Sequence, residues 1–128
     1  MTLSKQPPNP HMIRRVPEQF SWVDHRLVRE RYIDNISHGA AALYLFLVTV
    51  SDAQGLSYYG DETLQKRLGL DGIDLSQARD NLVRQQLIAY KKPLYQVLAL
   101  DHSRKHVQVS TEPSSMQQIL QKMMGGGK

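Results

Sequence analysis

The side chains that most often carry catalysis or bind metals are few and scattered in this sequence. Cysteine is absent, which excludes disulfides, thiolate zinc sites and cysteine nucleophiles. Among the five histidines, His102 and His106 lie four residues apart across an expected turn, and Asp101 is the nearby carboxylate. We interpret them as surface residues. The glycines of "MMGGGK" follow an expected helix rather than open one, so they do not form a phosphate-binding loop. We therefore expect no catalytic residues, no metal, no cofactor and no enzymatic activity.

A second set of side chains has the chemistry needed to recognise bases and phosphates. Gln77 can pair with an adenine edge and Ser76 can bond to several bases. Asp74 and Asp80 can accept from a cytosine amino group, although a carboxylate near phosphates is otherwise repelled. Several cations nearby in the chain could supply phosphate contacts: Lys66, Arg67, Arg79, Arg84, Lys91, Lys92, Arg104 and Lys105.

The length and composition of the chain indicate a single domain of ordinary globular character. It has 128 residues, 41% hydrophobic residues and a formal charge of +4, with a pI near 9.5. The charge favours a polyanionic partner modestly. The longest apolar run, "AAALYLFLV" at 40–48, is about half the length needed to span a bilayer, so no membrane contact is expected. The lack of cysteine and of a secretory signal favours a cytoplasmic protein.

The N-terminal region is predicted to be an arm. Residues 1–17 contain four of the six prolines and few large apolar side chains, which is typical of an extended or disordered segment. Arg14 and Arg15 near its end either grip phosphates or remain solvated. After the arm, Phe20 and Trp22 alternate like a short strand. A helix is then expected that Asp24 caps and that turns three apolar side chains inward: Leu27, Val28 and Ile33.

Three further helices are predicted at about 38–52, 61–68 and 72–87. The residues expected to cap or end them are Ser37, Gly55, Gly60 or Asp61, Gly69 and Asp71. An apolar strand ending at Tyr90, a turn at "KKP" and a strand over 95–99 then predict a β-hairpin. The inward positions of these elements should form the core: Leu43, Phe46, Leu47, Leu64, Leu68, Leu82 and Ile88.

These elements resemble those of a winged helix-turn-helix. Residues 43–100 carry an apolar first helix, the stretch "SYYGDETL", the turn "LGL" and an apolar ladder that runs into "LI". The same pattern is shared by bacterial winged-helix regulators and by plasmid or phage replication-initiation proteins. The resemblance implies an α+β fold, mostly α, with a small β-hairpin wing and an extra C-terminal helix. The expected parts are an arm at 1–17, a winged-helix domain at 18–110, and a C-terminal helix and tail at 111–128.

The expected function is sequence-selective binding of double-stranded DNA, in a bacterial transcriptional regulator or a replication-initiation-type protein. The third helix of the motif departs from the usual pattern, because its outward positions, including Ile73, carry no cation near its start. An alternative is a winged-helix module for protein–protein interaction or oligomerisation without direct DNA reading. The acidic third helix and the exposed Ile73 favour that alternative.

The C-terminal region is predicted to contain a strand at "KHVQVS" (105–110) and a last helix that opens at Pro113. An apolar stripe follows helical spacing on this helix, and it must dock on its own domain or on a second copy of the chain. A homodimer would match paired DNA half-sites. The residues proposed for dimerisation are Met116, Ile119, Leu120 and Met123.

Overall fold

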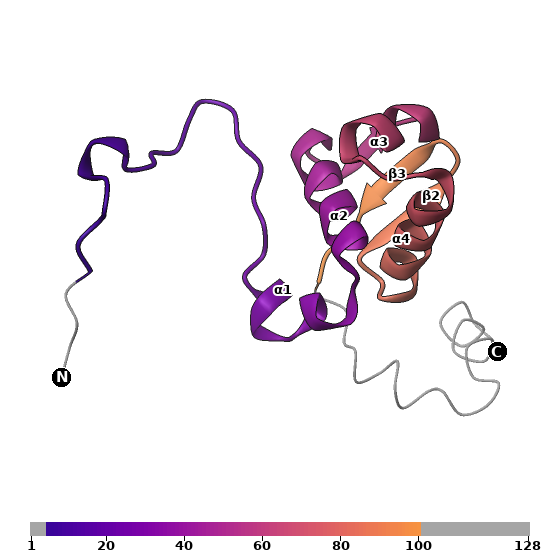
Figure 1. The fold of residues 1–128 in the computed structure, drawn as a ribbon, viewed down its shortest axis with the longest axis horizontal. Coiled ribbons are helices and arrows are strands. Elements are labelled where there is room, and N and C mark those ends of the chain that lie inside the picture. The colour runs from indigo at the N-terminus through magenta and orange to yellow at the C-terminus, as the bar shows by residue number, and fades with distance from the viewer. Residues whose placement is uncertain (1–4, 101–128) are drawn as a thin grey trace.

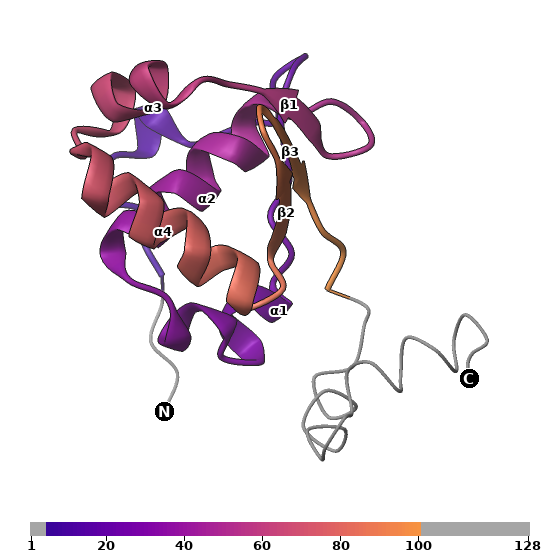
Figure 2. The ribbon, with the colours of Figure 1, turned by 90° about the vertical axis from the view of Figure 1, so that its right-hand side faces the viewer.

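The computed structural model describes residues 5–100, and residues 1–4 and 101–128 lie outside the described part. The fold is α+β and mostly helical, with the element order and strand order of a winged helix (Figure 1). The antiparallel sheet has the order β1-β3-β2 and packs against α2 and α4 (Figure 2). The elements are η1 (Pro10–Met12), α1 (Arg26–Arg29), η2 (Tyr32–Asn35), α2 (His38–Val50), β1 (Leu56–Tyr58), α3 (Asp61–Leu68), α4 (Gly72–Arg84), β2 (Ile88–Lys91) and β3 (Leu94–Val97).

Helix α2 begins where the sequence predicts and ends two residues earlier than expected. The Ser37 side chain accepts a hydrogen bond from the backbone N–H of Ala40 at 3.0 Å, which satisfies one of the free N–H groups of the first turn. Gly55 does not end this helix, contrary to the prediction. It lies in the turn before β1 with φ +83°, and a Cβ there would approach the Val97 carbonyl oxygen to 2.6 Å. Gly55 therefore permits the close approach of this turn to the end of β3.

The turn between α3 and α4 follows the prediction closely. Gly69 has φ +69° and ends α3, and the Asp71 carboxylate accepts from the N–H of Asp74 at 2.7 Å to cap α4. Helix α4 ends at Arg84 rather than 87. Gln86 then adopts φ +62°, the left-handed conformation that favours glycine, and this turns the chain into β2.

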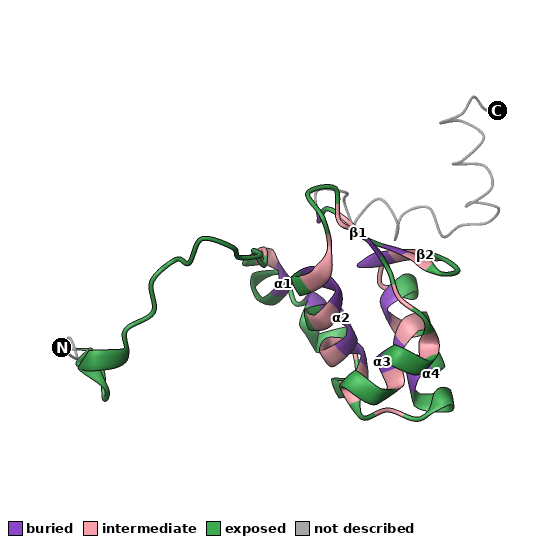
Figure 3. Ribbon diagram, turned by 90° about the horizontal axis from the view of Figure 1, so that it is seen from above, coloured by how far each residue is buried: buried purple, intermediate pink, exposed green. Residues whose placement is uncertain are grey.

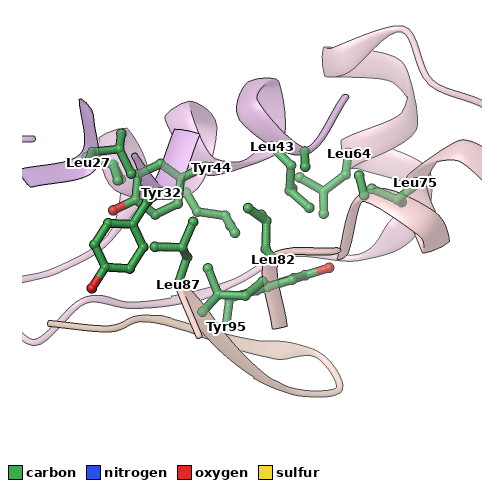
Figure 4. Packing of buried hydrophobic residues seen from close by; sticks show 14 of the residues in the cluster. Leu27, Tyr32, Leu43, Tyr44, Leu64, Leu75, Leu82, Leu87 and Tyr95 are labelled. Carbon is green, nitrogen blue, oxygen red and sulfur yellow. The ribbon is translucent and has the colours of Figure 1, made fainter. Parts of the chain in front are cut away.

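The described residues form one hydrophobic core, which lies between α2, α3, α4 and the sheet and also takes in Leu27 of α1 and Tyr32 of η2 (Figure 4). The predicted core is confirmed: five of its residues are buried, and the other two, Phe46 and Leu68, pack against them partly exposed. Tyr32 and Tyr95 are also fully enclosed and were not predicted. The buried part of the predicted core comprises Leu43, Leu47, Leu64, Leu82 and Ile88.

The predictions for residues 20–37 were wrong in three respects. Residues 20–22 form no strand, and the expected helix is divided into α1 and η2. Arg31 separates them with φ +63°, a conformation that an α-helix cannot contain. The break turns Val28 and Ile33 outward, 64% and 39% exposed, and Tyr32 into the core.

Strand β1 was not predicted either, because three residues are too few to show a clear alternation of apolar and polar side chains.

The described part of the arm, residues 5–17, and the three residues after it are exposed throughout and extend away from the helices (Figures 1 and 3). Ser21 ties its base to the domain by donating a hydrogen bond to the carbonyl of Thr49 at 3.2 Å. No helix within residues 5–100 has the length and apolar character needed to cross a membrane. The predicted strand at 105–110 and the helix that opens at Pro113 lie outside the described residues.

Candidate nucleic-acid interface

The exposed edge of α4 brings most of the predicted base-reading side chains onto one surface. Ile73, Ser76, Gln77 and Asp80 are all exposed, and their spacing of three or four residues places them along one side of the helix. The opposite side buries Leu75, Ala78 and Leu82 in the core. We call the exposed positions, together with Asp74, the α4 ridge: Ile73, Asp74, Ser76, Gln77 and Asp80.

Asn81 fixes the orientation of the ridge from the side of α2. Its amide oxygen accepts from the backbone N–H of Ser37 at 2.8 Å, and its amide nitrogen donates to the carbonyl of Asn35 at 3.2 Å. One side chain of α4 therefore satisfies backbone groups at the junction of η2 and α2, which limits rotation of α4 about its axis. Sequence reasoning missed this role, because the partners lie more than forty residues away.

Arg79, one of the predicted binding cations, is directed into the domain rather than toward solvent. Its side chain is only 12% exposed and forms an ion pair with Asp61 at the start of α3, with an Nη1–Oδ1 distance of 2.9 Å. The same nitrogen donates to the Tyr95 hydroxyl at 2.7 Å. The guanidinium also lies over the Tyr90 ring, 4.5 Å from its centroid. Arg79 therefore joins α3, α4 and the hairpin.

The contacts of Arg79 shift its own pKa and the pKa values of its two hydrogen-bond partners, Asp61 and Tyr95. Burial disfavours its charged form, but the hydrogen bonds to Asp61 and to Tyr95 outweigh this, so the pKa of the guanidinium is raised. The hydrogen bond from Arg79 lowers the pKa of Asp61 despite partial burial of the carboxylate. Burial raises the pKa of the Tyr95 hydroxyl, and the hydrogen bond from Arg79 opposes that rise only in part. Arg79 therefore stays charged and engaged inside the domain.

The cations of α3 lie in its last turn and are exposed. Lys66 and Arg67 are favourably placed near the negative end of the helix dipole. The Arg67 guanidinium lies 5.9 Å from the centroid of the Phe46 ring, and Phe46 in turn meets Tyr59 edge to face. The aromatic contact holds Arg67 near the surface of the domain while its charge remains accessible.

The cations of the hairpin lie beside the start of α3. Lys91 ends β2 and Lys92 lies in the turn to β3; both are exposed, and the Lys92–Pro93 peptide bond is cis. The carbonyl of Pro93 accepts from the N–H of Tyr59 at 3.2 Å. The hairpin turn is therefore held against the segment between β1 and α3, and the wing is short.

Tyr58 is a candidate contact residue that the sequence analysis missed. It is 71% exposed, and strand pairing places it opposite Leu94, which is itself opposite Lys91. Residues paired in this way project from the same face of a sheet, so Tyr58 and Lys91 share the outer face. The sequence alone could not show that Tyr58 lies near Lys91, because β1 and its pairing with β3 were not predicted.

The remaining predicted site residues fall into two groups. Arg84 is exposed at the end of α4 and belongs with the cations flanking the ridge. The predicted second pair of DNA-binding cations and the predicted dimerisation stripe lie outside the described residues: Arg104, Lys105, Met116, Ile119, Leu120 and Met123. Across residues 5–100, no three histidine, aspartate or glutamate side chains gather as a metal site.

Comparison with known proteins gives one distant structural similarity. No family model matches the sequence. No curated protein matches it either. A solved structure described as "Structure of Rep-DNA complex" aligns with 74% of this chain and 86% of its own, at 14% identity and a TM-score of 0.45. Similarity this low transfers no role to any residue of the present chain.

Proposed function

We propose that this protein binds double-stranded DNA, with α4 selecting sequence and flanking cations supplying most of the affinity. The observation that carries the proposal is the α4 ridge, which presents Ser76 and Gln77 to solvent from a helix held rigidly by Asn81 and Arg79. Rigid support matters because base recognition depends on the accurate placement of a few side chains. We infer a cytoplasmic role as a bacterial transcriptional regulator or a replication-initiation-type protein.

Phosphate and base contacts are divided between elements in this proposal. Lys66, Arg67, Arg84, Lys91 and Lys92 are all exposed. None of these five cations forms an ion pair with another residue of the described range 5–100. Contacts of this kind fix the protein on the duplex without reading its sequence. The ridge contributes selectivity instead, because its own carboxylates repel phosphate unless a base donor satisfies them.

The first test is a titration of the full chain with random-sequence duplexes and with genomic fragments at low and moderate salt. We expect binding of all duplexes at low salt, weakening as salt rises, with some genomic fragments retained longer. No binding of either DNA at low salt would overturn the proposal.

Replacing Lys91 and Lys92 together with alanine should weaken binding to every duplex. Each lost phosphate contact reduces the slope of log affinity against log salt by about 0.9, so the pair should reduce it by roughly 1 to 2. A matched control replaces Arg29 and Arg31, two exposed cations near α1, which lies at the end of the domain opposite α3 (Figure 1). Equal losses in both variants would mean that the effect is only one of net charge.

A protein-docking role is the second candidate, and the charge of α4 favours it. Asp71, Asp74 and Asp80 are exposed, and Ile73 beside them is 69% exposed. Acidic side chains around an apolar one fit a basic protein surface as well as a DNA groove.

Replacing Asp74 and Asp80 with asparagine distinguishes the two candidates. If the ridge faces DNA, loss of two repulsive charges should tighten binding to random duplexes at low salt. If the ridge faces a basic protein, DNA affinity should not change. The comparison uses Glu30→Gln and Asp34→Asn as the control, because both carboxylates are exposed and neither belongs to the ridge.

A further inference from the structure

A cleft lies on the domain where the base of the arm, the end of α2 and the segment after β3 meet. Its volume is about 550 Å³. No residue of α3 or α4 lines it, so the cleft is separate from the α4 ridge. Polar side chains, among them Asp24, Arg26 and Asp52, form part of its lining. The larger apolar side chains of the lining include Phe20, Trp22, Tyr44, Val48, Val97 and Leu100.

The two aromatic residues that follow the arm, Phe20 and Trp22, are unusually exposed for their size. Trp22 is 73% exposed and Phe20 is 63% exposed, although Ser21 between them is hydrogen-bonded to α2. Removing large apolar side chains from water lowers the free energy. Two such side chains exposed at one cleft therefore indicate a surface that is normally covered.

The chain itself leads from this cleft to a segment that could cover it. Leu100, the last described residue, is 4% exposed and lines the cleft, so the following residues start there. Residues 101–112 can span at most roughly 40 Å when extended, which is ample for the chain to turn back. A segment tethered this closely has a high effective concentration at the cleft, which favours docking within one chain.

The segment 113–124 has the chemistry that the cleft requires. Its apolar side chains recur at helical spacing, and Lys122 is its only charged residue. Lys122 lies off the apolar stripe on a helical projection, so the stripe can enter the cleft without carrying a charge of its own into it. Methionine supplies three of the apolar side chains; it adapts to irregular surfaces and packs well against aromatic rings.

We propose that residues 113–124 dock in this cleft of their own chain and cover Trp22. The proposal is independent of DNA binding, because the cleft and the α4 ridge share no residues. It selects the intramolecular alternative for the apolar stripe over the homodimer.

Fluorescence of the full chain tests the proposal directly, because Trp22 is the only tryptophan. In the unaltered protein we expect blue-shifted emission and slow quenching by acrylamide. Replacing Ile119 and Leu120 together with aspartate should shift the emission to the red and increase the quenching constant several-fold. The matched control, Gln118→Asp with Gln121→Asp, adds the same charges on the polar side of the expected helix and should leave both signals unchanged.

Two outcomes would overturn the proposal. Equal quenching of Trp22 in all three proteins would show that the segment does not cover the cleft. The second outcome is detected by sedimentation at the concentrations used for fluorescence. Docking within one chain predicts a monomer whose Trp22 stays protected on dilution, whereas protection that disappears as a dimer dissociates would place a second copy in the cleft.

Discussion

Arg79 shows that the sequence identifies a cation but not whether its side chain faces solvent or the interior. On a helical projection it lies between the buried and exposed sides of α4, so either position was open from the sequence. Asp61 and Tyr95, the partners that decide the matter, are 18 and 16 residues away and lie on other elements. Local spacing carries no information about such pairs. Lys91 and Lys92, which have no such partners, are exposed as expected, although Lys91 ends β2 and only Lys92 lies in the turn.

The ion pair between Arg79 and Asp61 should make stability depend on acidity in a defined direction. The hydrogen bond from Arg79 lowers the pKa of Asp61 below its ordinary value of 3.8. The folded protein therefore resists protonation at Asp61. The stabilisation is present above about pH 4 and is lost as pH falls through the lowered pKa. Because the carboxylate is 46% exposed, we expect Asp61→Asn to cost no more than about 1 kcal/mol at neutral pH.

Urea unfolding of the two proteins across the acidic range measures this difference. The pKa of Asp24 is also lowered, to about 2, mainly by the hydrogen bond from the Arg26 side chain. That group is present in both proteins, so the comparison isolates Asp61. We expect the two stabilities to converge as the solution becomes more acidic. A difference that is constant with pH would exclude an ionic contribution from the pair.

At the scale of helices and strands, predictions from the sequence were most accurate where the hydrophobic periodicity and the capping residues indicated the same helix boundaries. The turn between α3 and α4 was predicted to the residue because Gly69 and Asp71 have distinct backbone and capping roles between two short apolar patterns. The segment before α2 was predicted wrongly because its apolar spacing suggested a continuous helix. The positive φ of Arg31 accompanies the burial of Tyr32 in the core, and no local pattern reveals either one.

The packing of α3 and α4 gives a graded prediction for two leucines. Leu82 is fully buried, so Leu82→Ala should lower the free energy of unfolding by about 2 to 5 kcal/mol. Leu68 is partly exposed at the end of α3, so Leu68→Ala should cost less. Chemical denaturation of both variants provides the comparison. The assigned phases of the helices would be contradicted if both losses were below about 0.5 kcal/mol, well under the range for a buried leucine.

At the scale of the molecule, its surfaces carry different chemistry. The α4 ridge is polar and acidic with one exposed isoleucine, while five of the exposed cations lie on α3, at the end of α4 and at the hairpin: Lys66, Arg67, Arg84, Lys91 and Lys92. The cleft between the base of the arm and α2 is lined by both apolar and polar side chains, and none of its residues belongs to α3 or α4. This separation allows the α4 ridge to contact a duplex while the cleft is occupied.

A backbone NMR titration of the full chain with a short duplex at low salt tests the DNA-binding account most directly. Amide signals identify the bound surface residue by residue, and non-specific binding makes a random sequence sufficient. We expect the largest changes over residues 73–80 and at Lys91 and Lys92, with little change around Arg29. Changes centred on the α1–η2 segment, or no changes at saturating DNA, would contradict the claim that α4 and its flanking cations form the DNA-binding surface.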